Sequence, residues 1–369
     1  MTLEGFAAPE VERAYARARA LCERAGDTPQ LFPALWGLWL FSWGQGDVPQ
    51  ARRIADDLLA RAERIDDRGV RLEAHHALWA TLFSQGELAA ACDHAARGYA
   101  LYDPEAHGAL ATVYGNHDAG ACSRLFGGWA LGLLGFPERA VESLHEAIAL
   151  GERSQQPFDL AWAHFYLAAV HQCQGERAAA RARAEAALAM AREHAFGLIS
   201  AWAAALRGWA IAAEGQPDAG ISGLRDGLAA AQATGSKRFD SYFLGLLGEA
   251  CLLAGRASEG LTAVAEGLAT VAMTGERFYE AELWRLRGEL LRAEDDPAPP
   301  EECFLRAREI ARGQGSRWLE LRAAMSLSRL RRLRGRTEAA REMLAGVYGG
   351  FAEGLETADL REARALLQA

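Results

Sequence analysis

The sequence predicts an all-α fold, an α-solenoid of about eight helix-turn-helix repeats. Three observations favour this class. A glycine recurs at intervals of 40 residues with one exception, apolar residues on both sides of it follow at intervals of three and four, and no segment alternates apolar and polar residues as a strand would. The length of 369 residues would alone suggest about two or three domains. A short repeat instead makes it one continuous array.

The turn of each repeat is predicted at a glycine that closes an apolar, aromatic segment. Successive turn glycines lie 40 residues apart, except for one interval of 49 residues, and Asp295 takes the one place without a glycine. The glycines are Gly46, Gly86, Gly135, Gly175, Gly215, Gly255 and Gly335.

Small residues at fixed distances from each turn mark the contact between the two helices of a repeat. Gly208 and Gly248 lie seven residues before a turn glycine, and Ala180 and Gly220 lie five residues after one. Small side chains let two helix backbones approach closely. We therefore expect a single solenoid over residues 1–369, with an N-terminal flanking helix (8–26), the repeat array (27–347) and a C-terminal capping helix (348–369).

Composition and charge favour a cytoplasmic protein without nucleic-acid or membrane partners. The formal net charge is −9 and the isoelectric point about 5.6, whereas nucleic-acid-binding proteins are usually basic. No apolar run approaches the roughly 18 residues of a membrane span. The six cysteines are widely spaced without a CxxC pair, which fits buried free thiols better than disulfides or a zinc motif.

The repeats resemble a known family. A small residue at position 8, a turn glycine near 15 and a small residue at 20 are similar to the tetratricopeptide (TPR) repeat, lengthened from about 34 to 40 residues. Residues 158–195 carry the pattern well, as FDLAWAHFYLAAVHQCQGERAAARARAEAALAMAREHA. The resemblance implies a right-handed superhelix.

Several segments resemble a narrower group, the C-terminal TPR-like region of bacterial regulators that also carry class III adenylate/guanylate cyclase and P-loop ATPase modules. They are GNHDAGACSRLFGGWALGLLGFPERA, ERFYEAELWRLRGELL, CFLRAREIARGQGSRWLELRAAMSLSRL and YGGFAEGLETADLREARALL. The resemblance implies a bacterial signalling role. Neither upstream module is recognisable in this sequence. The one lysine, Lys237, has no Walker A context, so we expect no enzyme activity and no cofactor.

The long interval between Gly86 and Gly135 predicts an insertion near residues 101–121. It contains His107, His117 and Asp118, residue types that could ligate a metal or transfer protons. Contact with a ligand or partner and capping of a helix over 119–134 are the alternatives. Because no HxxxH or HExxH spacing is present, we assign no metal site.

Aromatic residues recur on the first helices of the repeats, which line the concave face of a TPR solenoid. Two interpretations are open, an aromatic groove that binds a peptide or apolar ligand and close packing between repeats. The residues are Trp36, Trp43, His76, Phe83, Trp129, Trp162, Phe165, Trp202, Trp209 and Tyr242.

From residue 282 onward, charged residues occupy the same helix positions. They form either a solvated helix face or a basic patch that docks an acidic peptide, a carboxylate or a phosphate-bearing ligand. The arginines are Arg285, Arg292, Arg322, Arg329 and Arg332.

These features predict a non-enzymatic regulatory or scaffolding module that binds a protein segment or partner domain in its concave groove. The alternative is a small-molecule sensor with an aromatic pocket near the insertion at 101–121, around Trp129, Trp162 and Trp202.

Overall fold

The computed structural model describes residues 9–25, 30–294 and 299–368. Across these residues the chain is helical and contains no strand, so the predicted all-α solenoid is confirmed. The turn position at Asp295 lies outside the described residues. None of the described helices combines the length and apolar character needed to cross a membrane.

Within the described residues, eight antiparallel helix pairs follow the flanking helix α1 (Pro9–Ala25). A short helix α6 (Pro104–His107) and a 3₁₀ helix η1 (Gly108–Thr112) lie in the insertion, and α19 (Ala358–Gln368) ends the chain. The pairs are α2 (Leu31–Gly44) with α3 (Val48–Ala62), α4 (Arg68–Gln85) with α5 (Leu88–Leu101), α7 (Ala119–Leu134) with α8 (Pro137–Ser154), α9 (Pro157–Cys173) with α10 (Arg177–Glu193), α11 (Gly197–Ala213) with α12 (Pro217–Ala233), α13 (Asp240–Leu253) with α14 (Ala257–Thr274), α15 (Glu280–Ala293) with α16 (Pro300–Gly313), and α17 (Arg317–Leu333) with α18 (Thr337–Tyr348).

All seven predicted turn glycines adopt positive φ, between +68° and +99°. In this left-handed conformation the chain ends one helix and reverses. At Gly86, the glycine N–H donates to the Phe83 carbonyl and the Glu87 N–H donates to the Leu82 carbonyl. Glycine is favoured here because it has no Cβ to strain the left-handed backbone.

The first helix of each pair is the inner one. In α9 apolar residues occur on every side, and most of the helix is buried. Its partner α10 buries one stripe, formed by Ala180, Ala184, Ala187, Leu188 and Ala191, and leaves its arginines outside. Intervals of three and four along α10 produce this single buried face.

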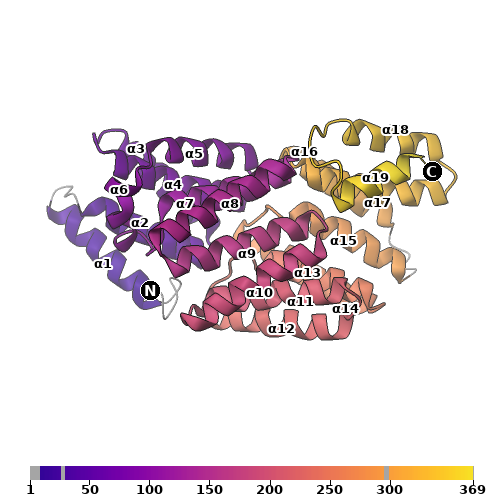
Figure 1. Cartoon of the computed structure of the whole chain (residues 1–369), viewed down its shortest axis with the longest axis horizontal. Helices are drawn as coiled ribbons and strands as arrows, with labels where there is room; N and C mark the ends of the chain where they lie inside the picture. Colours follow the sequence, from indigo (N-terminus) through magenta and orange to yellow (C-terminus); the bar gives the residue numbers. More distant parts are fainter. Residues whose placement is uncertain (1–8, 26–29, 295–298, 369) are drawn as a thin grey trace.

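Successive turns of the superhelix touch each other. The N–H of Lys237, just before α13, donates to the Gly44 carbonyl at the end of α2, over 3.1 Å. The equivalent N–H of Arg277, before α15, donates to the Ser84 carbonyl in α4. Ser316 Oγ, before α17, donates to Leu133 O in α7 over 3.0 Å. The inner helices α2, α4 and α7 thus contact the segments that precede α13, α15 and α17, five pairs later. The array as a whole runs from α1 to α17–α19 at the opposite end (Figure 1).

Candidate functional site

The aromatic residues predicted to line an open groove are buried instead. Each of the ten exposes at most 3% of its surface. Neighbouring turns of the superhelix close over them, and loops from the second turn fill the space that an open groove would occupy. In this conformation the aromatic residues therefore serve in packing between repeats and line no open groove. The same holds for Trp129, Trp162 and Trp202, which were predicted to line the pocket of a small-molecule sensor.

Two aromatic side chains from the second turn occupy this interior. Phe239 precedes α13, and its ring centroid lies 5.1 Å from that of Trp202 and 5.5 Å from that of Trp129. Phe278 precedes α15 and lies 4.8 Å from Phe83 and 5.2 Å from Trp129. We call residues 236–239 the plug segment because they enter the interior from the loop between α12 and α13.

A cation lies in the centre of this apolar region. Arg238 is 1% exposed, and its guanidinium carbon lies 3.3 Å from the ring centroid of Trp43 and 5.3 Å from that of Trp202. One period of 40 residues later the same position holds Phe278, and two periods later Trp318, both buried. Packing at this position therefore accepts an aromatic ring, and the arginine is a departure from the repeat.

The hydrogen-bonding capacity of Arg238 is largely unused. One Nη atom lies 3.5 Å from the Tyr166 hydroxyl, but Nε and the other Nη have no partner among the described residues. The indole N–H groups of Trp162 and Trp202 likewise lack acceptors. Burial lowers the pKa of Arg238, since the charged form loses its hydration. The interior thus contains a group of unpaired donors, which suit carbonyl or carboxylate acceptors.

Glu276, an acidic residue beside the plug segment, bonds to the backbone of that segment and not to the Arg238 guanidinium. The Glu276 carboxylate accepts the Phe239 N–H over 3.0 Å and the Ser241 hydroxyl over 3.2 Å. Burial raises its pKa to about 7, although the Phe239 N–H and Arg238 act in the opposite direction. Phe239 has a φ of +64°, a strained conformation for a bulky residue. Strain and unpaired donors therefore coincide at the plug segment.

The insertion folds back onto the inner helices. His107 accepts the Asp103 N–H at Nδ1 over 3.1 Å and is partly exposed on α6. Asp118 caps α7 by accepting the Ala121 N–H over 2.7 Å, and it also accepts the Tyr102 hydroxyl over 2.7 Å. His117 is buried beneath the segment. The structure therefore separates His107 from the other two residues.

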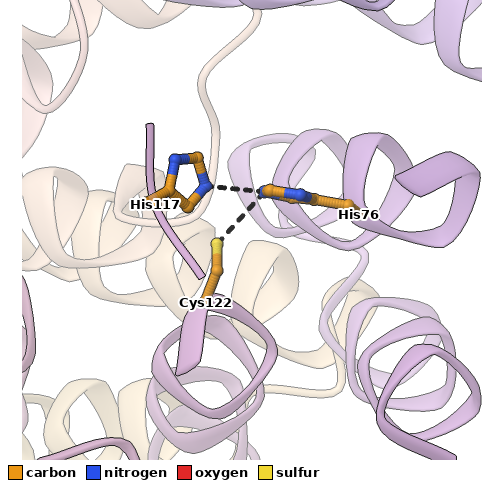
Figure 2. A group of neighbouring side chains, drawn as sticks. All are labelled: His76, His117 and Cys122. Atoms are coloured by element: carbon orange, nitrogen blue, oxygen red, sulfur yellow. Dashed lines mark hydrogen bonds between the residues drawn. The ribbon is translucent and has the colours of Figure 1, made fainter. Parts of the chain in front are cut away.

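His117 meets two side chains that the sequence analysis did not connect with it. Its Nε2 lies 3.0 Å from Nε2 of His76 in α4, which in turn lies 3.2 Å from Sγ of Cys122 in α7. The side chains of His117 and Cys122 point toward the His76 ring (Figure 2). All three are buried, and this burial lowers the pKa of both histidines to about 3 and raises the pKa of the Cys122 thiol. His76 lies one repeat away in sequence, so no short motif could reveal the group.

The predicted basic patch is an ion-paired network rather than an open docking surface. Arg322 lies at the centre of the network and contacts three carboxylates, those of Glu282 over 3.0 Å, Glu249 over 3.3 Å and Asp359 over 3.6 Å. Glu282 is also paired with Arg285, over 2.6 Å. Arg292 pairs with Glu289, Arg329 with Glu362, and Arg332 donates to the Leu366 carbonyl. Acidic residues of α13, α15 and α19 therefore neutralise the positive charge that the sequence shows locally.

An open groove exists elsewhere, on the outer surface where two turns meet. It has a volume of about 740 Å³ and lies between the turn after α4 and the end of α16. Arg277, Arg306 and Arg312 line it, and each of these exposed arginines is paired with a glutamate. Their sequence positions do not distinguish these arginines, because Arg277 lies between two helices and Arg306 and Arg312 have helix positions typical of a solvated face.

Comparison with known proteins shows no matching family model and no matching curated protein. Solved structures do match. A Rap protein complexed with competence and sporulation factor aligns over 97% of this chain and 94% of its own, with 12% identity and a TM-score of 0.66. The Rap conjugation gene regulator of plasmid pLS20, in complex with the Phr* peptide, aligns over 91% and 96%, with 11% identity and a TM-score of 0.57.

Aspartyl phosphate phosphatase F from Bacillus subtilis also aligns, over 87% of this chain and 94% of its own, with 10% identity and a TM-score of 0.51. At these identities the likeness concerns the fold alone. This chain therefore has the TPR-like α-solenoid fold along almost its whole length.

Proposed function

We propose that this protein is a non-enzymatic regulatory module that binds an extended peptide or protein segment inside its superhelix, at Arg238. The observation that carries the proposal is the buried guanidinium with two unpaired nitrogens beside two unpaired indole N–H groups. A buried donor without an acceptor costs about 1–3 kcal/mol, more when it is charged. A peptide in the interior would supply carbonyl and carboxylate acceptors.

Binding at this place requires the plug segment to move, since the interior is filled in the closed form. Only a few hydrogen bonds join the plug segment to α2, among them those from Lys237 N and Ser236 Oγ to the Gly44 carbonyl. The strained backbone of Phe239 favours release. Two of the structurally similar proteins were solved in complex, one with competence and sporulation factor and one with the Phr* peptide, which supports a peptide as the occupant.

A regulatory rather than catalytic role is favoured by the placement of the chemically active side chains. His117 and Asp118 are buried and held by contacts to His76, Tyr102 and the start of α7. The sequence resemblance to the repeat region of cyclase and ATPase regulators favours a cytoplasmic signalling context. The neighbouring coding sequence tests that context directly.

The binding proposal is tested with a displayed library of linear peptides selected on the wild-type protein. Selected peptides are then titrated against three variants, Arg238→Met, Arg312→Met in the outer groove and Arg225→Met on the outer helix α12. We expect Arg238→Met alone to weaken binding, by about 10- to 100-fold, as loss of a charge-assisted hydrogen bond would. A loss confined to Arg312→Met would assign the partner to the outer groove instead. Binding of free small carboxylates, without peptides, would favour the sensor alternative.

A further inference from the structure

We propose that His76, His117 and Cys122 form a buried binding site for one thiophilic cation, Zn²⁺ or Cu⁺. The site joins the insertion to α4 and α7. It involves none of the donors at Arg238 and does not depend on a peptide partner.

The three side chains have the spacing that a single ion requires. Their ligand atoms all lie within 4.8 Å of one another, and two of the separations are 3.0 and 3.2 Å. With metal–nitrogen bonds of about 2.0–2.1 Å and metal–sulfur bonds of about 2.3 Å, tetrahedral ligands lie about 3.4–3.6 Å apart. Binding would thus need the two short separations to lengthen by a few tenths of an ångström, and the third, between His117 Nε2 and Cys122 Sγ, to shorten by up to about 1.2 Å. Two imidazoles and a thiolate are ligands that Zn²⁺ and Cu⁺ both prefer.

Hydrogen bonds at the Nδ1 atoms orient both imidazoles so that their Nε2 atoms can bind a metal ion. Nδ1 of His76 lies 2.8 Å from Oε2 of Glu73, and Nδ1 of His117 lies 3.2 Å from the Gly115 carbonyl. A carbonyl only accepts, so Nδ1 of His117 carries the hydrogen and its Nε2 presents a lone pair. An ionised Glu73 fixes the same tautomer in His76. Metal-binding histidines commonly have such partners on the second nitrogen.

With Glu73 ionised, the two lone pairs would lie 3.0 Å apart, a contact that a cation between them turns from repulsive to attractive. Zn²⁺ with the Cys122 thiolate and the Glu73 carboxylate is neutral overall, whereas Cu⁺ with the same two groups carries a net charge of −1. Ion binding releases the thiol proton of Cys122 to solvent. Three protein ligands suit three-coordinate Cu⁺, whereas Zn²⁺ would add a water molecule.

A metal-free network is the competing description. If Glu73 holds a proton, it donates to Nδ1 of His76, and Nε2–H of His76 then donates to His117. Burial raises the pKa of Glu73 well above its usual value, which favours this proton. The two descriptions differ in what happens when metal is offered.

The test uses the full-length protein, stripped of metal by a chelator and titrated with Zn²⁺, or with Cu⁺ under anaerobic conditions. Bound metal is measured after gel filtration, and the melting temperature is recorded alongside. The matched variants are Cys122→Ser and His117→Gln, with Cys251→Ser, another buried free thiol in α13, as the control. We expect one ion per chain and a higher melting temperature in the wild type and in Cys251→Ser. Both ligand variants should lose at least about nine-tenths of the bound metal.

Cobalt substitution keeps the test decisive if a ligand variant fails to fold. Co²⁺ bound to the wild type should show a thiolate-to-cobalt charge-transfer band, which is absent when Cys122 does not ligate. Zn²⁺ alone or Cu⁺ alone at stoichiometry supports the site and identifies its ion. No binding of either ion, or equal binding by Cys122→Ser and the wild type, would overturn the proposal in favour of the metal-free network.

Discussion

The guanidinium of Arg238 lies directly over the indole ring of Trp43, 3.3 Å from its centroid, although the two residues belong to different turns of the superhelix. A cation over the face of tryptophan is attracted by the ring quadrupole, by about 2 kcal/mol when the pair is desolvated. This contact, and the hydrogen bond from Lys237 to Gly44 beside it, close the interior. Two guanidinium nitrogens of the same arginine have no acceptor. Arg238 therefore both holds the two turns together and offers hydrogen-bond donors to a partner.

Replacing Arg238 by Met should leave the fold equally stable or stabilise it by up to about 2 kcal/mol. A buried cation that lacks a hydrogen-bonded acid is removed, and an apolar side chain of similar length remains. Urea unfolding followed by circular dichroism measures the change. A loss of stability would instead mean that the Trp43 contact outweighs the desolvation of the charge.

Replacing Arg322 by Met should have the opposite effect and destabilise the fold by about 3–5 kcal/mol. The change leaves the buried Glu282 without one of its two guanidinium partners. Burial alone would raise the pKa of Glu282, but Arg285 and Arg322 outweigh it and lower that pKa. Arg225→Met, an exposed pair with Glu259, is the control and should change little. Equal effects of the two variants would contradict the network as described.

The turn glycines should differ according to whether they lie between superhelical turns. A Cβ at Gly46 would lie 2.9 Å from Thr274 Cγ2, whereas a Cβ at Gly255 would meet no atom within 4 Å. Both have positive φ, +77° and +68°, so an alanine pays the same backbone strain at each. Gly46→Ala should therefore cost about 1 kcal/mol more in unfolding free energy than Gly255→Ala. Equal melting temperatures for the two variants would argue against contact between the turns.

Glu276 should make stability depend on pH in an unusual direction. Its folded pKa of about 7 exceeds the ordinary value of 4.5, so the folded state keeps a proton that the unfolded state releases between these pH values. The contribution of this carboxyl to stability therefore falls as pH rises from about 4.5 to 7 and is constant above. Relative to Glu276→Gln, the wild type should lose stability between pH 5 and pH 8. A difference that is constant over this range would place the folded pKa near its ordinary value.

The repeat period could be predicted from the sequence because it depends on local features. A turn that needs positive φ selects glycine, and paired helices need small residues at fixed distances, so Gly86 or Gly248 can be recognised without knowledge of distant parts of the chain. The same local features do not predict how closely successive turns of the superhelix approach each other.

The candidate sites could not be predicted because they depend on contacts between turns. An inner-helix tryptophan such as Trp129 has the same sequence pattern whether it faces an open groove or Phe278 from the next turn. Arg322 looks unpaired along its own helix because its acidic partners, Glu249 and Glu282, come from other helix pairs. The departure at Arg238 could have been noticed by comparing positions 238, 278 and 318, one period apart.

Hydrogen exchange shows whether a peptide enters the interior at Arg238. Amide exchange of the wild type is measured with and without a peptide selected from the displayed library. Exchange should change first in the plug segment and at the end of α2, where Lys237 N–H is bonded to the Gly44 carbonyl. Changes confined to the outer groove between α4 and α16, with the plug segment and α2 unaffected, would contradict it.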